Sequence, residues 1–72
     1  MSKYEYGFLH IVIDTLSLPE NNNTIDEMQE NIEKLNKLEK VINDCKFSDE
    51  KKSNLLKYLK EGRDKLEVLV PQ

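Results

Sequence analysis

One histidine and one carboxylate stand at a spacing that could serve acid–base chemistry. His10 and Asp14 are four residues apart, so on a helix they share a face and the carboxylate could orient the imidazole. Catalysis would also need a nucleophile, for which we considered Cys45 and Ser17. Neither lies in a recognisable motif of cysteine or serine enzymes. We therefore expect a solvent-facing helix pair and no catalytic residue.

Metal and cofactor sites are not expected either. The chain has one histidine and one cysteine, far apart, which make no recognisable metal-ligand set. Gly7 and Gly62 are its only glycines, so a glycine-rich phosphate loop is excluded. Cys45 continues an apolar helical stripe, where a free cysteine behaves as a small hydrophobe. A single cysteine forms no internal disulfide, which suits a reducing cytoplasm.

The basic residues near the C-terminus are the only candidates for contact with nucleic acid. Residues 1–45 carry four basic and nine acidic side chains, whereas residues 46–72 carry seven and five. Acidic residues interleave with the basic ones, which is typical of a solvated helix face. We keep nucleic-acid binding as an alternative, and its candidate contacts are Lys51, Lys52, Lys57, Lys60 and Arg63.

The N-terminal segment has more apolar surface than one packing partner needs. Its apolar residues cover roughly 220° of a helical projection, whereas a helix packed on one side needs a stripe of about 100°. We expect Tyr6 and Ile13 on the exposed flank, and Phe8 and Val12 against the rest of the protein. Aromatic residues are common at interaction hot spots, although they could equally fill a small core. The predicted interface residues are Tyr4, Tyr6, Phe8, Leu9, Ile13 and Leu16.

Three helices are needed to position these residues. Ser2 and Glu5 have capping-box spacing, which favours a helix over residues 3–16 that ends before Pro19 and the three asparagines at 21–23. A second helix over residues 24–45 begins with the capping box of Thr24 and Glu27, and its apolar stripe recurs every three or four residues.

The third helix is expected over residues 49–70, with Ser48 as its N-cap. Gly62 weakens it by roughly 1 kcal/mol against alanine. An alternative ends this helix at Gly62 and makes residues 66–70 a strand paired with residues 4–13, in a βααβ arrangement. Because the connection at residues 46–48 is short, we predict an antiparallel hairpin of the second and third helices. Antiparallel packing would place the acidic residues within 26–33 beside the basic residues Lys60, Arg63 and Lys65.

The predicted fold is thus an all-α three-helix bundle in a single domain, residues 1–72, with the apolar N-terminal helix packed on the hairpin. We find no secretory signal and no membrane-spanning segment, and expect a cytoplasmic protein. A chain of 72 residues buries only about 60% of its unfolded surface, so a second copy or a partner would help to stabilise it.

The leading functional hypothesis is a helical protein–protein interaction module, homodimeric through its first helix, that binds a larger protein as an inhibitor or adaptor. The Asn-, Lys-, Glu- and Ile-rich composition suits an accessory factor of a phage or plasmid. The alternative is a small DNA-associated regulator that uses the basic C-terminal helix.

Overall fold

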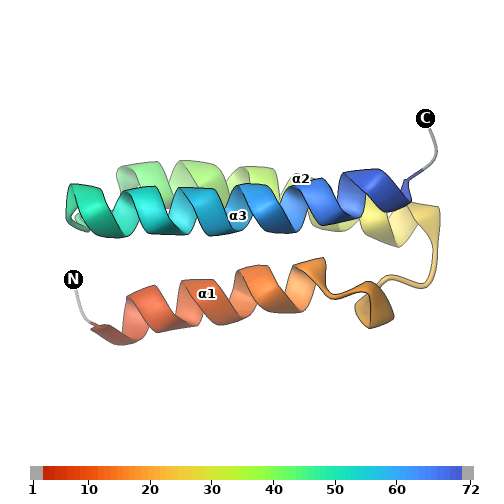
Figure 1. Cartoon of the computed structure of the whole chain (residues 1–72), viewed down its shortest axis with the longest axis horizontal. Helices are drawn as coiled ribbons and strands as arrows, with labels where there is room; N and C mark the ends of the chain where they lie inside the picture. The colour runs from red at the N-terminus through yellow and green to blue at the C-terminus, as the bar shows by residue number, and fades with distance from the viewer. Residues whose placement is uncertain (1–2, 71–72) are drawn as a thin grey trace.

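The computed structural model describes residues 3–70 of the 72 and contains three α-helices joined by short connections (Figure 1). They are α1 (Lys3–Ser17), α2 (Ile25–Asp44) and α3 (Asp49–Leu69), with a short 3₁₀ turn, η1 (Pro19–Asn21), after α1. The predicted three-helix bundle is confirmed. The βααβ alternative is wrong, because residues 66–69 continue α3 and no strand occurs within residues 3–70.

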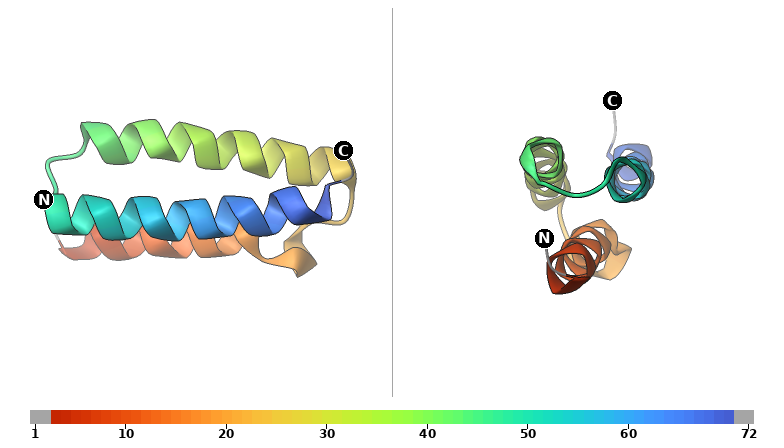
Figure 2. Two further views of the ribbon diagram at one scale, coloured as in Figure 1. Left: turned by 45° about the horizontal axis from the view of Figure 1, so that its top comes forward. Right: turned by 90° about the vertical axis from the view of Figure 1, so that its left-hand side faces the viewer.

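All three helices run along the long axis of a body of 36 × 20 × 15 Å. Helices α2 and α3 form an antiparallel hairpin, and α1 lies along its underside (Figures 1 and 2). The contacts of α1 with α3 are extensive, whereas those with α2 are few. The N-terminal helix therefore packs mainly on the helix farthest from it in sequence.

The two hairpin helices begin after the predicted N-cap residues. The Thr24 hydroxyl accepts a hydrogen bond from the Glu27 backbone N–H at 3.1 Å, and the Ser48 hydroxyl accepts one from Lys51 at 3.3 Å. The Glu27 carboxylate accepts from the backbone of Asn23 at 3.0 Å, one residue before the position a capping box requires. The predicted cap of α1 involves Ser2, which lies outside the described residues.

The core is a single apolar cluster to which every helix contributes. Its two central residues in α2 are Leu35 and Ile42, which are fully buried. Phe47 closes one end of the cluster from the connection between α2 and α3, and its ring meets Tyr6 edge-on at 6.0 Å. The remaining buried apolar residues are Leu9, Ile13, Leu55, Leu59 and Leu66.

Gly62 marks a close approach of α1 to α3. It is buried within α3, and a Cβ atom placed there would lie 3.0 Å from the Cβ of Ser17 and 3.4 Å from Cγ2 of Ile13. Ser17 is also buried, at 5% exposure, and its hydroxyl donates to the Asp14 carbonyl at 3.1 Å. The missing side chain at Gly62 thus makes room for the last turn of α1.

Asparagine side chains secure the connection from α1 to α2. The Asn21 amide donates to the Thr15 carbonyl and the Asn22 amide to the Leu18 carbonyl, both at 2.7 Å. Asn31 of α2 donates to the Leu16 carbonyl at 3.3 Å. The Thr15 and Leu16 carbonyls belong to the last turn of α1, where a helix leaves carbonyls without an intrahelical partner.

Candidate interaction surface

The predicted interface residues of α1 divide between the core and the surface. Leu9 and Ile13 are 8% and 0% exposed and belong to the core, whereas Tyr4 and Phe8 are 87% and 64% exposed. Tyr6 and Leu16 are half-buried at the edge of the core.

The predicted orientation of the flanks is therefore wrong for Ile13 and Phe8. Ile13 faces the hairpin and Phe8 faces outward. The reason is the contact at Gly62, which draws Ser17 and Ile13 toward α3 and so turns the Phe8 side of the helix away. The helical projection alone carries no information on this rotation, because the apolar arc is wider than the stripe that the hairpin covers.

The polar side of α1 packs against α3 through a row of rings. His10 lies between Tyr6, at a ring-centroid distance of 4.8 Å, and Tyr58 of α3, at 4.5 Å. The Lys51 ammonium lies 5.7 Å from the centre of the Tyr6 ring, within the range of a cation–π contact. The side of α1 that the sequence suggested would face solvent thus forms part of the bundle.

Asp14 is engaged with Tyr58 across the α1–α3 interface. The Tyr58 hydroxyl donates to Oδ1 of Asp14 at 2.9 Å. This hydrogen bond, together with some burial and the nearby negative charges of Asp14 and Glu61, raises the pKa of Tyr58 above its ordinary value of 10.0. Asp14 therefore serves as an acceptor that holds α1 on α3, rather than as the orienting partner of His10.

The opposite side of α1 carries a second row, which we call the outer stripe: the large apolar residues Tyr4, Phe8 and Ile11, followed by the polar Thr15. All four residues are exposed, Ile11 to 65%. Their spacing of four, three and four residues is the a/d spacing of a coiled-coil seam. The buried row formed by Tyr6, Leu9, Ile13 and Leu16 lies on the other side of the helix, so α1 has one apolar row in the bundle and one outside it.

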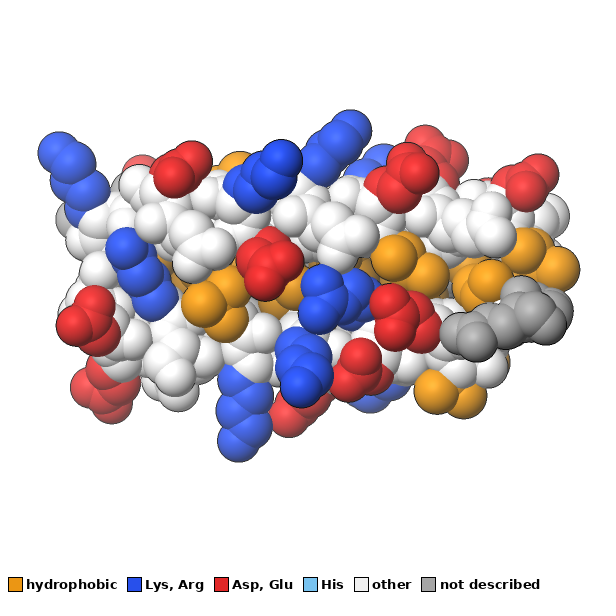
Figure 3. All heavy atoms as spheres, turned by 90° about the horizontal axis from the view of Figure 1, so that it is seen from above, with side chains coloured by type: hydrophobic (Ala, Val, Ile, Leu, Met, Phe, Trp, Pro, Cys, Tyr) orange, Lys and Arg blue, Asp and Glu red, His pale blue; other side chains and the backbone are white. Residues whose placement is uncertain are grey.

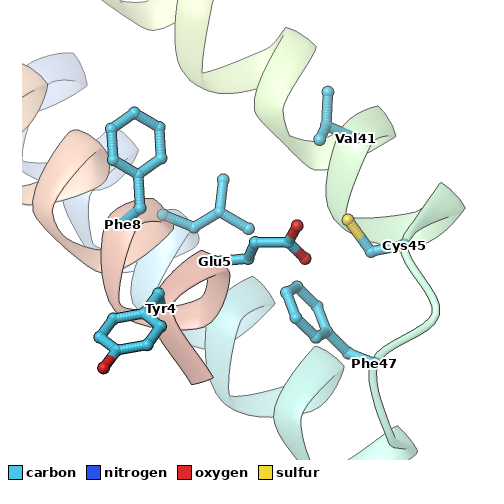
Figure 4. A pocket seen from close by; sticks show the side chains of 7 residues that line it. Tyr4, Glu5, Phe8, Val41, Cys45 and Phe47 are labelled. Atoms are coloured by element: carbon cyan, nitrogen blue, oxygen red, sulfur yellow. The ribbon is translucent and has the colours of Figure 1, made fainter. Parts of the chain in front are cut away.

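An apolar groove separates the outer stripe from α2. Two hollows, of about 380 and 340 Å³, share Val41 as a lining residue and together follow α1 from Tyr4 to Leu16. Figure 4 shows the first hollow, with Phe8 and Glu5 on one wall and Val41 and Cys45 on the other. The second is flanked by Lys34 and Lys37. We call this feature the α1–α2 groove, and its apolar walls are Leu9, Val12, Leu16, Phe47, Leu38, Val41 and Cys45.

The groove exists because α1 packs extensively on α3 and contacts α2 at few residues. The end-on view in Figure 2 shows α1 below the hairpin, with α2 and α3 side by side above it. Val41 remains 47% exposed as a result. Cys45, which the sequence placed in the core stripe, packs at the edge of the core and its thiol is free. The packing of α1 against α2 is thus incomplete, and apolar side chains remain exposed between the two helices.

The basic residues of α3 do not gather on one face. Lys51 lies over Tyr6, Lys52 donates to the Asn43 carbonyl at 3.2 Å, and Arg63 pairs with Glu39 at 3.7 Å. Arg63 also donates to Asn36 at 2.9 Å, so it meets the middle of α2 rather than the predicted acidic start. Lys57 and Lys60 are exposed.

The hairpin face in Figure 3 accordingly shows basic and acidic side chains interspersed, with hydrophobic atoms visible between them. No continuous basic patch is visible on this face for a phosphate backbone to follow.

Within the described part of the chain, no group of three or more potential metal ligands comes together. No helix of residues 3–70 has the length and apolar composition required to cross a membrane. No protein-family model, curated protein sequence or solved structure matches this chain.

Proposed function

We propose that this protein is a protein–protein interaction module that docks an apolar helix of another polypeptide chain on the outer stripe of α1 and in the α1–α2 groove. The observation that carries the proposal is the exposure of Tyr4, Phe8 and Ile11 at coiled-coil spacing on a helix whose opposite side already supplies the core. Contiguous apolar surface rimmed by polar residues is typical of interaction sites.

The size of the hydrophobic term supports a helix rather than a short peptide as the ligand. Fully burying a Phe or Ile side chain is worth roughly 1.5–3 kcal/mol, so Phe8 and Ile11, at 64% and 65% exposure, contribute about 1–2 kcal/mol each when covered. Association itself costs at least about 4 kcal/mol. Tyr4, at 87% exposure, adds a similar amount, so the outer stripe about balances that cost, and a ligand that also fills the groove beside Val41 would bind more tightly.

A module of this kind acts by covering a surface of its target. The proposal therefore includes the role of an inhibitor or adaptor of a larger protein, in the cytoplasm, as a phage- or plasmid-type accessory factor. The dispersal of the basic residues of α3, three of which are engaged within the bundle, gives the nucleic-acid alternative no support from geometry.

Affinity capture from the source cell with matched variants tests the proposal. Ile11→Glu places a charge in the outer stripe, and Val68→Glu places the same charge on α3, where Val68 is 84% exposed. We expect wild type and Val68→Glu to retain the same partner and Ile11→Glu to lose it. Equal retention by both variants would locate the binding surface elsewhere and refute the proposal.

A further inference from the structure

The outer stripe of α1 matches a copy of itself. We infer that a second copy of this chain docks on it, with the two α1 helices antiparallel about a two-fold axis that passes between Phe8 and Ile11. This inference rests on the proposed function, because it uses the same surface and names the helix that occupies it.

The first argument is the symmetry of the stripe. An axis between Phe8 and Ile11 sets Phe8 of each copy against Ile11 of the other, and Tyr4 against Thr15. All these positions have coiled-coil spacing, so each side chain can pack between neighbouring side chains of the facing helix. The stripe contains no charged residue, so its burial leaves no unpaired charge within it. Closed two-fold pairing of identical surfaces is also the commonest form of protein oligomer.

Charge fixes the orientation of the two helices. Glu5 lines the groove at the start of α1, whereas Lys34 and Lys37 flank it near Val12 and Leu16. An antiparallel pair brings Glu5 of one copy toward the lysines of the other. A parallel pair would place Glu5 beside its own copy, which like-charge repulsion disfavours. Because Lys34 is exposed and within 3.8 Å of Glu30, and Glu5 also interacts within its own chain, these contacts favour a register and add little affinity.

The exposed area of the outer stripe sets the strength expected of the dimer. A stable interface buries about 800 Å² on each partner. An aromatic side chain has about 150–250 Å² to bury, so Tyr4 and Phe8, at 87% and 64% exposure, supply on the order of 300 Å². Ile11, at 65% exposure, adds to this area. A two-fold pair of the outer stripe is thus smaller than a standard stable interface, and we expect a weak, reversible dimer.

Light scattering over a concentration series provides the first test. We expect the wild type and Val68→Glu to dimerise with the same dissociation constant. Ile11→Glu should raise that constant more than about 100-fold, since two-fold symmetry buries the unpaired charge twice. Circular dichroism would show whether each variant keeps the helical content of the wild type, so that a loss of folding is not counted as a loss of dimerisation.

Disulfide trapping tests the register. In a Cys45→Ser background, Tyr4→Cys and Thr15→Cys proteins should cross-link when mixed, and each should cross-link poorly alone. Self-linking of Tyr4→Cys alone would indicate parallel helices and overturn the inference. A wild type that stays monomeric but captures another protein through Ile11 would overturn the inference and leave the proposed function intact. A monomer that captures nothing would overturn both.

Discussion

Substituting Gly62 by alanine sets two opposite effects against each other. In a helix interior alanine is better than glycine by roughly 1 kcal/mol. The new Cβ would lie 3.0 Å from the Cβ of Ser17 and 3.3 Å from its Oγ. The Ser17 Cβ is fixed to the backbone of α1, so the contact is relieved only if α1 moves away from α3. Overpacking of this kind costs about 1–3 kcal/mol. We therefore expect Gly62→Ala to lower the free energy of unfolding by about 1 kcal/mol, as the overpacking cost exceeds the helix gain.

Two matched variants separate the terms. Gly7 is the other glycine in a helix, and a Cβ there would meet nothing within 4 Å, so Gly7→Ala should gain the helix term alone and stabilise by about 1 kcal/mol. In a Ser17→Gly background the nearest remaining atom to the new Cβ is Cγ2 of Ile13 at 3.4 Å, which is an ordinary contact. Gly62→Ala should become stabilising in that background.

Urea titration and thermal melting, followed by circular dichroism at one protein concentration, measure these differences. A change of 1 kcal/mol shifts the melting temperature of a domain of this size by roughly 4–8 °C, well above experimental error. The decisive quantity is the coupling between Gly62→Ala and Ser17→Gly in a double-mutant cycle. If Gly62→Ala stabilises wild type and the Ser17→Gly variant equally, the close approach of α1 and α3 at this position is refuted.

Three further predictions concern the cap of α3, the α1–α3 hydrogen bond and the two sides of α1. Ser48→Ala should lower stability in urea by about 0.5–2 kcal/mol, because it removes the cap, and an unchanged titration would contradict that role. In a spectrophotometric titration Tyr58 should ionise above pH 10.0, and Asp14→Asn should lower its pKa. The pKa of Tyr58 is higher in the folded than in the unfolded state, so the stability from this hydrogen bond should be present below pH 10.0 and lost as the pH rises through the raised pKa. A free energy of unfolding that does not change with pH in this range would contradict the hydrogen bond. Ile13→Ala should destabilise the fold by about 2–5 kcal/mol, whereas Phe8→Ala should weaken self-association more than stability; equal losses of stability at both positions would contradict the assignment of the two sides.

The helices could be predicted from the sequence because their signals are local. The stripes of α2 and α3 follow the helical period, and Thr24 and Ser48 cap the predicted termini. Which side of α1 faces the hairpin could not be read in the same way, because its apolar arc exceeds what one contact covers. The choice is made by a residue far along the chain, Gly62.

Two signals in the sequence were open to a different interpretation. The buried row of α3 passes through Gly62. A glycine between Leu59 and Leu66 indicates a close helix contact as readily as a weak point. Phe47 was assigned to a connection, yet it is 7% exposed. Of the exposed residues of the outer stripe, Tyr4 and Phe8 were among the predicted interface residues, whereas the exposure of Ile11 is evident only once the rotation of α1 is known.

The pairing of α1 with α3 also bears on the order of events in folding. The α2–α3 hairpin is joined by a short connection, so its contacts form with little loss of chain entropy, whereas docking α1 closes a loop that spans all of α2. We expect the hairpin to form first and α1 to dock late in the folding reaction. Truncations at Leu35 or Leu55 should then slow refolding, and truncation at Ile13 should mainly accelerate unfolding. The escape of α1 from the hairpin would accordingly set the kinetic lifetime of the native state.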